Sequence, residues 1–283
     1  MQVFPIGVVR SLVHARKQMP AFGAPARIEV YRDYEEGLLR FEKHSHVWVL
    51  AWLDRAERNV LQVTPRGVAD PGPAGLHGVF AVRSPARPNP VGLTATRVTR
   101  VAGNAIEVDR LDFLDGTPVL DLKPYFVSRD LIFSANNAPV GKPSGRPALR
   151  DSLIAQAVHF HGELCGDLAV AVRILEHFRF EVLGLEEWDG AQFTVPLGRP
   201  CIIDAVMGIT RASPGRRNLL FHEDDRSLTV AAQTRGDYRI LAPAEAEFSS
   251  TLDAPQESVF LFQPRQSQVI LGADADLRPD HHR

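Results

Sequence analysis

The chain has 283 residues, a formal net charge of −2 and a composition that is 45% hydrophobic and 23% charged. This composition is ordinary for a globular protein and excludes disordered and fibrous classes, while the longest apolar stretches are too short to cross a membrane. The length predicts one large or two modest domains. Two cysteines exclude a disulfide framework, and the N-terminus does not resemble a leader peptide, so a reducing cytoplasm is the expected location.

Residues 1–125 carry 16 lysines and arginines against 13 acidic residues, and the remainder carries the acidic excess. A mildly basic first half is compatible with contacts to one RNA loop through a few phosphates, although chance asymmetry explains the difference equally well. No strand in this half is followed by a G-x-G-x-x-G pattern, which argues against a Rossmann-type nucleotide site.

The first half is rich in short β-branched and aromatic runs separated by turn residues, with one helical candidate at 33–38. Ile106 and Val108 share one strand face while Leu111 and Phe113 have the opposite parity, so a bulge is expected near Arg110. These features predict a small all-β barrel. The expected strands are 47–53, 78–82, 91–101 and 105–114.

The second half changes character after a Pro/Gly/Asn-rich stretch that is typical of a linker. An amphipathic helix is expected at 167–178, another is expected from Cys201 onward, and strands are expected at 228–232 and 259–263, which together predict an α+β domain. The expected organisation is a barrel at 1–128, a linker at 129–150, an α+β domain at 151–270 and a flexible tail at 271–283.

Two segments of the first half are candidates for binding chemistry. In the loop at 78–92, three prolines within six residues stiffen the backbone, and Arg83 and Arg87 are available for carboxylate, phosphate or an aromatic base. A rigid structural turn is the alternative. In the second segment, Asp121, Lys123 and Tyr125 alternate on one face of an extended strand, where Asp121 and Lys123 can also simply pair with each other. Trp48 and Trp52 share a strand face and are expected in the core.

These residues carry a family resemblance. The run at 5–11, Ser45-His-Val-Trp48, the Arg-Ser-x-x-Arg-Pro-Asn-Pro-x-Gly run at 83–92, and Asp115-Gly-Thr-Pro with Lys123-Pro-Tyr125 together resemble the TsaA-like (YaeB-like) family. The resemblance implies a β-barrel that binds S-adenosylmethionine without a Rossmann fold. It also implies N6-methylation of threonylcarbamoyladenosine at the tRNA position 3′ of the anticodon, and a homodimer.

For this reaction, the chemistry of the side chains makes Asp121, Lys123 and Tyr125 the catalytic candidates: Asp121 or Tyr125 could assist loss of the acceptor proton, and Lys123 could orient a carbonyl or phosphate. Arg87 is the candidate for contact with the tRNA anticodon loop. The resemblance itself implies the residues that contact the cofactor. The loop at 20–22 departs from the Pro-Arg-Gln common in relatives, so a contact there is expected through backbone. The implied cofactor residues are Pro20, Ala21, Phe22, Asp54, Arg55, Arg83, Leu93, Asp115, Gly116, Thr117 and Pro118.

The second half contains a compact group of metal-ligating residue types. His161 and Cys165 are four residues apart, Cys165 is expected at a helix start, and Cys201 begins a second apolar segment. One imidazole and two thiolates with an open fourth position suit Zn²⁺, whereas a buried histidine with two small buried thiols is the alternative.

Motifs at 160–165, 201–205 and 208–219 resemble the FmdE-like family, with departures at Glu163, Gly166-Asp167 and Ile209 that put a metal site in doubt. Three functions therefore stay open. The first is tRNA methylation. The second is methylation of another substrate chosen by the second domain. The third is a metal- or thiol-dependent FmdE-like protein of one-carbon or molybdoenzyme metabolism, with the barrel as a cofactor sensor.

Overall fold

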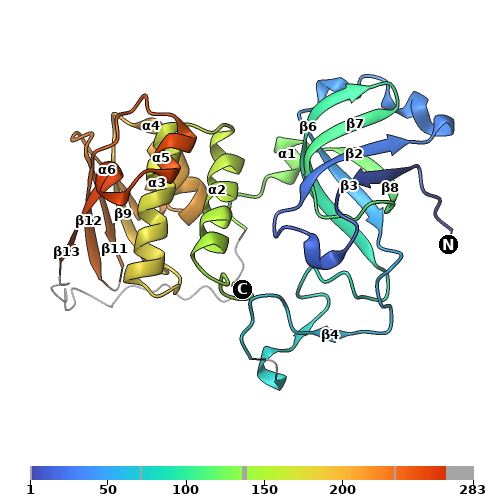
Figure 1. The fold of residues 1–283 in the computed structure, drawn as a ribbon, viewed down its shortest axis with the longest axis horizontal. Helices are drawn as coiled ribbons and strands as arrows, with labels where there is room; N and C mark the ends of the chain where they lie inside the picture. Colours follow the sequence, from blue (N-terminus) through green and yellow to red (C-terminus); the bar gives the residue numbers. More distant parts are fainter. Residues whose placement is uncertain (1, 71, 136–138, 233, 266–283) are drawn as a thin grey trace, which may run out of the picture. The chain divides into compact units, whose positions relative to one another are not determined.

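The computed structural model describes residues 2–70, 72–135, 139–232 and 234–265. The chain divides into two compact units, Met1–Lys142 and Pro143–Arg283 (Figure 1). The expected tail at 271–283 lies outside the described residues, and the other expected domain boundaries stay predictions. No described helix is long and apolar enough to cross a membrane.

The first unit is built around a closed antiparallel barrel with the strand order β1-β2-β7-β6-β3-β8, as the sequence predicts (Figure 1). Strands β1 and β8 close it where Gly7 pairs with Val119. A six-stranded barrel of this kind is narrow, so side chains fill its interior. The strands are β1 (Gly7–Ser11), β2 (Ala24–Val30), β3 (His46–Trp52), β6 (Val91–Ala102), β7 (Ala105–Leu111) and β8 (Pro118–Pro124).

The bulge expected near Arg110 is present in β7. Ala24 and Ala26 of β2 pair with Leu111 and Val108, so β7 contains one more residue than its partner over this interval. The extra residue shifts the parity of the strand, and Ile106, Val108 and Leu111 all reach the barrel core. A pattern that looks inconsistent with one strand therefore belongs to a single bulged strand.

Two sequence expectations for the first unit are wrong. The strand expected at 78–82 is reduced to Gly78. The guanidinium of Arg87 donates hydrogen bonds to the carbonyl oxygens of Val79 and Val82, which holds the segment as a turn. Trp48 and Trp52 are half-buried on the outer face of β3, since Val49 and its inward-facing neighbours already fill the narrow interior.

The other elements of the first unit are η1 (Arg16–Gln18), η2 (Arg32–Leu38), η3 (Phe41–Lys43), β4 (Gln62–Val63), η4 (Pro73–Gly75), β5 (His77–Gly78) and α1 (Val127–Asp130).

The second unit is a five-stranded sheet in the order β10-β9-β11-β12-β13 with helices packed on it, which confirms the expected α+β class (Figure 1). Among the strands that the structure describes in this unit, β9 and β10 pair in parallel and the other pairs are antiparallel. Its elements are α2 (Arg146–His161), α3 (Gly166–His177), η5 (Phe178–Val182), β9 (Gln192–Pro196), α4 (Pro200–Thr210), η6 (Pro214–Arg216), β10 (Leu219–His222), β11 (Ser227–Ala231), β12 (Arg235–Ile240), α5 (Phe248–Asp253), α6 (Gln256–Val259) and β13 (Phe260–Arg265).

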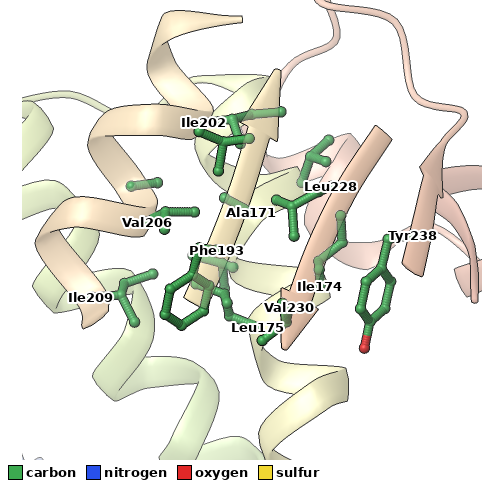
Figure 2. Packing of buried hydrophobic residues seen from close by; sticks show 14 of the residues in the cluster. Ala171, Ile174, Leu175, Phe193, Ile202, Val206, Ile209, Leu228, Val230 and Tyr238 are labelled. Carbon is green, nitrogen blue, oxygen red and sulfur yellow. The ribbon is translucent and has the colours of Figure 1, made fainter. Parts of the chain in front are cut away.

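Helix α3 is the centre of this unit, and every one of its residues is buried. Figure 2 shows Ile174 of α3 and Val206 of α4 among the side chains of the sheet, including Phe193 and Leu228. Helices α2 and α5 also contact α3. Because α3 is buried on all sides, its position within this unit is fixed, and so is the position of its N-terminal residue.

Candidate functional site

The antiparallel register places all the expected cofactor segments at one end of the barrel. At this end β1, β3 and β7 finish while β2, β6 and β8 begin, and we call it the turn end. The segment 20–22 precedes β2, residues 54–55 follow β3, and residues 115–117 precede β8 at Pro118. Arg83 lies in the loop before β6, and Leu93 lies near the start of β6.

Hydrogen bonds tie these segments to the barrel strands at the turn end. The backbone N–H of Leu53 donates to the carbonyl of Pro90 at 2.8 Å, which ties the end of β3 to the proline-rich loop. A guanidinium N–H of Arg83 approaches the carbonyl oxygen of Leu93 at 3.5 Å. The carboxylate of Asp115 accepts the N–H of Ser11 at 3.0 Å, which anchors the Asp-Gly turn beside β1. The proline-rich loop is thus tied to the end of β3 and the Asp-Gly-Thr-Pro turn to the end of β1, both at the turn end.

Gly116 gives this end an open backbone surface. Its φ of 80° is strained for residues with a side chain. A Cβ placed on Gly116 would have only the Arg55 guanidinium within 4 Å, at 4.0 Å. The bare turn lets a ligand approach the backbone closely, with Arg55 and the carboxylates of Asp54 and Asp115 in the adjoining segments. This arrangement fits a cofactor that combines a cationic sulfonium, hydroxyl groups and a carboxylate.

The three catalytic candidates follow β8 away from the turn end. Asp121 and Lys123 form an ion pair of 2.6 Å on the outer face, the pairing that the sequence left open as an alternative. The N–H of Tyr125 donates to the carbonyl of His46, at the opposite end of β3, and its ring lies 5.5 Å from that of Trp48. A strand of seven residues is roughly 20 Å long, so Tyr125 is remote from the cofactor candidates within one protomer.

Arg87, the candidate for RNA contact, is engaged inside its own loop. Its Nε donates to Ser84 at 2.8 Å, and its Nη2 donates to Val79 and Val82 at 2.5 Å each. Three backbone acceptors occupy much of the guanidinium, which has five N–H donors. The geometry therefore gives Arg87 a structural role in shaping the loop, and its contact with RNA stays a prediction.

In the second unit, the fold brings together the three expected metal-ligating residues. One donor atom from each of His161, Cys165 and Cys201 lies within 4.8 Å of the other two. His161 ends α2, Cys165 caps the N-terminus of α3 and Cys201 lies in the first turn of α4. The sulfur of Cys165 accepts the N–H of Leu168 at 3.4 Å, which fixes the position of this sulfur at the start of α3.

Asp204 orients the imidazole of the cluster. Its carboxylate lies 3.0 Å from Nδ1 of His161, and since a carboxylate only accepts, this nitrogen carries the proton. The lone pair then belongs to Nε2, which lies 3.5 Å from the sulfur of Cys165. Metal-ligating histidines commonly have this arrangement. Asp204 is not among the residues predicted for the site, although its helical spacing of three residues from Cys201 places both on one face of α4.

A buried ion pair fixes the spacing of the two thiols. Arg199, which precedes α4, donates from Nε to Asp167 in the first turn of α3 at 3.0 Å, and both side chains are below 10% exposed. The same guanidinium donates to the carbonyl of Ala242 at 3.2 Å. Burial and the nearby sulfur of Cys165 raise the pKa of the Cys201 thiol to about 11, so Cys201 is a neutral thiol in the metal-free protein at pH 7.

A pocket of about 500 Å³ opens beside the cluster. It is lined by Leu164, Cys165 and Gly166 and by the segment 244–249. The segment approaches so closely that a Cβ on Gly166 would overlap the carbonyl of Ala246. This pocket could not be predicted from local sequence, because its two walls are about 80 residues apart in the chain.

Comparison with known proteins gives two family matches. Residues 8–131 match the tRNA-methyltransferase O N-terminal domain, and residues 160–262 match the family described as FmdE, Molybdenum formylmethanofuran dehydrogenase operon. The chain is thus a closed β-barrel of the first kind followed by an α+β domain of the second.

Individual relatives agree with the family matches. A probable S-adenosyl-L-methionine-binding protein of Archaeoglobus fulgidus is 34% identical over 78% of this chain, which spans only 61% of that relative. One of Methanothermobacter thermautotrophicus is 42% identical over 46% of this chain and 93% of its own length. The tRNA (adenine(37)-N6)-methyltransferase of Mus musculus is 38% identical over 37% of this chain and 24% of its own length. The chain belongs to the tRNA-methyltransferase O family, with an FmdE domain in its second half.

Proposed function

We propose that the barrel binds S-adenosyl-L-methionine at the turn end and transfers its methyl group to N6 of threonylcarbamoyladenosine, at the tRNA position 3′ of the anticodon. The observation that carries this proposal is the convergence of five segments, scattered between residues 20 and 118, on one end of the barrel. The names of the relatives from Archaeoglobus fulgidus and Mus musculus support cofactor binding and tRNA as substrate, respectively.

The residues of the turn end suit the recognition of this cofactor. The guanidinium groups of Arg55 and Arg83 are available for its carboxylate and hydroxyl oxygens, and the carboxylates of Asp54 and Asp115 offset the sulfonium charge. The cofactor supplies an electrophilic methyl group, and the protein's task is to place the acceptor nitrogen in line with it. Asp121 is the catalytic candidate nearest the turn end along β8, and it is proposed to accept the N6 proton.

Incubation with methyl-labelled cofactor and two tRNA samples tests this function. Threonylcarbamoylated tRNA should gain one methyl group on its modified adenosine, detected by nucleoside mass spectrometry, while tRNA without the modification should not. Label in neither sample contradicts the proposal. If the protein binds the cofactor but methylates only a protein or small molecule, the second domain directs a different substrate.

A homodimer is proposed as the active form, supported by apolar side chains at the turn end. Leu12, directly after β1, is 93% exposed, and Leu93 and Phe22 are each about 40% exposed. Exposed apolar groups that cluster at one place mark interaction surfaces. A second copy of the chain would cover them and would bring another β8, with its Tyr125, into the assembly.

A metal site in the second unit is a second proposed function. The converging His161, Cys165 and Cys201 donors, with the imidazole fixed by Asp204, favour Zn²⁺ bound by one nitrogen and two sulfurs. Elemental analysis after purification without chelators tests it. About one zinc per chain is expected, and a Cys165→Ser variant should lose it. Absence of zinc, iron and other transition metals from the intact protein contradicts the proposal.

A further inference from the structure

The converging donor set is incomplete for a structural zinc site. Among the described residues it comprises His161, Cys165 and Cys201, and Asp204 is already hydrogen-bonded to the far nitrogen of His161. Structural zinc sites have four protein ligands, whereas sites with three protein ligands leave one position for an exchangeable molecule. The described residues therefore leave the fourth position open to an external ligand.

The pocket beside Cys165 is the route for that ligand. Its volume of about 500 Å³ falls within the range of small-molecule sites, and Cys165 belongs both to its wall and to the donor set. Arg199 binds the first turn of α3 through Asp167 and, through the carbonyl of Ala242, the chain two residues before the opposite wall. One buried side chain thus holds the metal-ligand helices and the pocket wall in a fixed relation.

The charges on the pocket wall indicate the kind of ligand. Glu245 and Glu247 line it, and none of the other described lining residues is a lysine or an arginine. Two carboxylates disfavour an anionic ligand and favour one with a positive group. We propose that this pocket binds a small cationic thiol, such as an aminothiol, whose sulfur completes the coordination of the metal. This inference rests on the proposed metal site. Soft thiolate donors suit a site that already has two sulfurs.

Cobalt-loaded full-length protein tests the proposal through its visible absorption. Cysteamine, 2-mercaptoethanol and mercaptoacetate have similar sizes and carry a positive, a neutral and a negative group, respectively. Cysteamine should change the ligand-field bands saturably and add sulfur-to-cobalt charge-transfer absorption. It should bind about tenfold more tightly than mercaptoacetate at low salt, since each nearby carboxylate contributes up to about fivefold.

Paired variants test the role of the wall. Replacing Glu245 and Glu247 together by Gln should abolish the preference for cysteamine and leave cobalt stoichiometry unchanged. The matched variant, with the exposed Glu223 and Glu257 replaced by Gln outside the pocket, should behave as wild type. A cobalt spectrum that no thiol alters, or cobalt that the thiols merely remove, overturns this inference and leaves the metal site standing. Failure to bind cobalt at all overturns both.

Discussion

At the scale of single residues, ligand binding at both sites depends on which donor and acceptor atoms of a side chain are not already used in contacts within the protein. Arg55 and Arg87 are both arginines of the first unit, yet Arg87 is occupied by three backbone carbonyls while Arg55 lies beside the bare Gly116 turn. Residue type alone makes them equivalent candidates. The hydrogen bonds distinguish the arginine that shapes a loop from the one that is available to a cofactor.

This distinction predicts the effect of removing Arg55. Arg55→Ala should weaken S-adenosyl-L-methionine binding about tenfold, the loss of one charged hydrogen bond. Isothermal titration calorimetry measures it, and the melting temperature should not change. The matched control is Arg27→Ala, which removes an exposed arginine paired with Glu29 on the side of the barrel. Equal affinities of the two variants would exclude Arg55 from the cofactor site.

Asp204 is predicted to act on the metal through His161. Asp204→Asn weakens the hydrogen bond that fixes the imidazole, so zinc affinity should fall about 10- to 100-fold. Competition with a chromophoric chelator measures this affinity. The control is Glu163→Gln, an exposed carboxylate in the turn between α2 and α3. An effect of Glu163→Gln as large as that of Asp204→Asn would contradict the orienting role.

At the scale of secondary-structure elements, the starts of α3 and α4 are coupled by the buried pair of Asp167 and Arg199. Arg199→Ala leaves a carboxylate buried without its partner, which typically costs about 3–5 kcal/mol. The second unit should therefore unfold at lower urea concentration. Arg235→Ala removes an exposed arginine of β12, so it should cost less than about 1 kcal/mol. Similar urea midpoints for the two variants would show that the buried pair is dispensable.

His177, at the end of α3, predicts how this unit responds to acid. Burial lowers the pKa of its imidazole, which is enclosed by the rings of Tyr238, Phe260 and Phe262. The unfolded chain takes up a proton near pH 6.5 while the folded protein resists it. Stability is therefore complete above that pH and is lost as the pH falls below it, by at most about 1.4 kcal/mol per pH unit.

A His177→Gln variant should flatten this dependence, because its amide can still bond to the hydroxyl of Tyr238 but does not titrate. Urea unfolding between pH 7 and pH 5 measures it. The fluorescence of Trp188 reports on the second unit when Trp48 and Trp52 are replaced by Phe. An unchanged slope in the His177→Gln variant would assign the pH response to other groups.

The elements that the sequence predicts correctly are those with a strong local pattern. Helix α3 follows from its apolar spacing, and the bulge in β7 follows from the change of parity after Val108. Helix α2 begins inside the expected linker at 129–150, because Pro139, Pro143 and Pro147 mask the spacing of the buried Leu149 and Leu153. Its apolar residues at intervals of four were a signal for a helix.

The sites depend more heavily on contacts between distant segments. His161, Cys165 and Cys201 could be chosen from residue type and a family resemblance, and their convergence agrees with that choice. The roles of Asp204 and Arg199 could not be predicted. Local sequence does not show that a hydrogen bond will join two helices or that an ion pair will be buried. Propensity describes single elements, whereas these contacts arise from their packing.

At the scale of the whole molecule, the assembly decides whether the barrel has a complete site. The exposed apolar residues at the turn end and the distance of Tyr125 from it both support a second copy of the chain. Leu12→Asp places a charge in the proposed contact, so it should convert a dimer to a monomer in light scattering and weaken cofactor binding.

Leu39 provides the matched control for this prediction. It is 82% exposed, but it lies between the end of β2 and the start of β3, which is the opposite end of the barrel. Leu39→Asp should therefore leave the dimer and cofactor binding intact, because a charge in water-exposed surface outside a contact costs little. If the unsubstituted protein is monomeric and still methylates tRNA, the turn end is complete within one chain. If Leu39→Asp dissociates the dimer instead, the contact lies at the other end, and the apolar residues beside the cofactor segments serve the cofactor or the RNA directly.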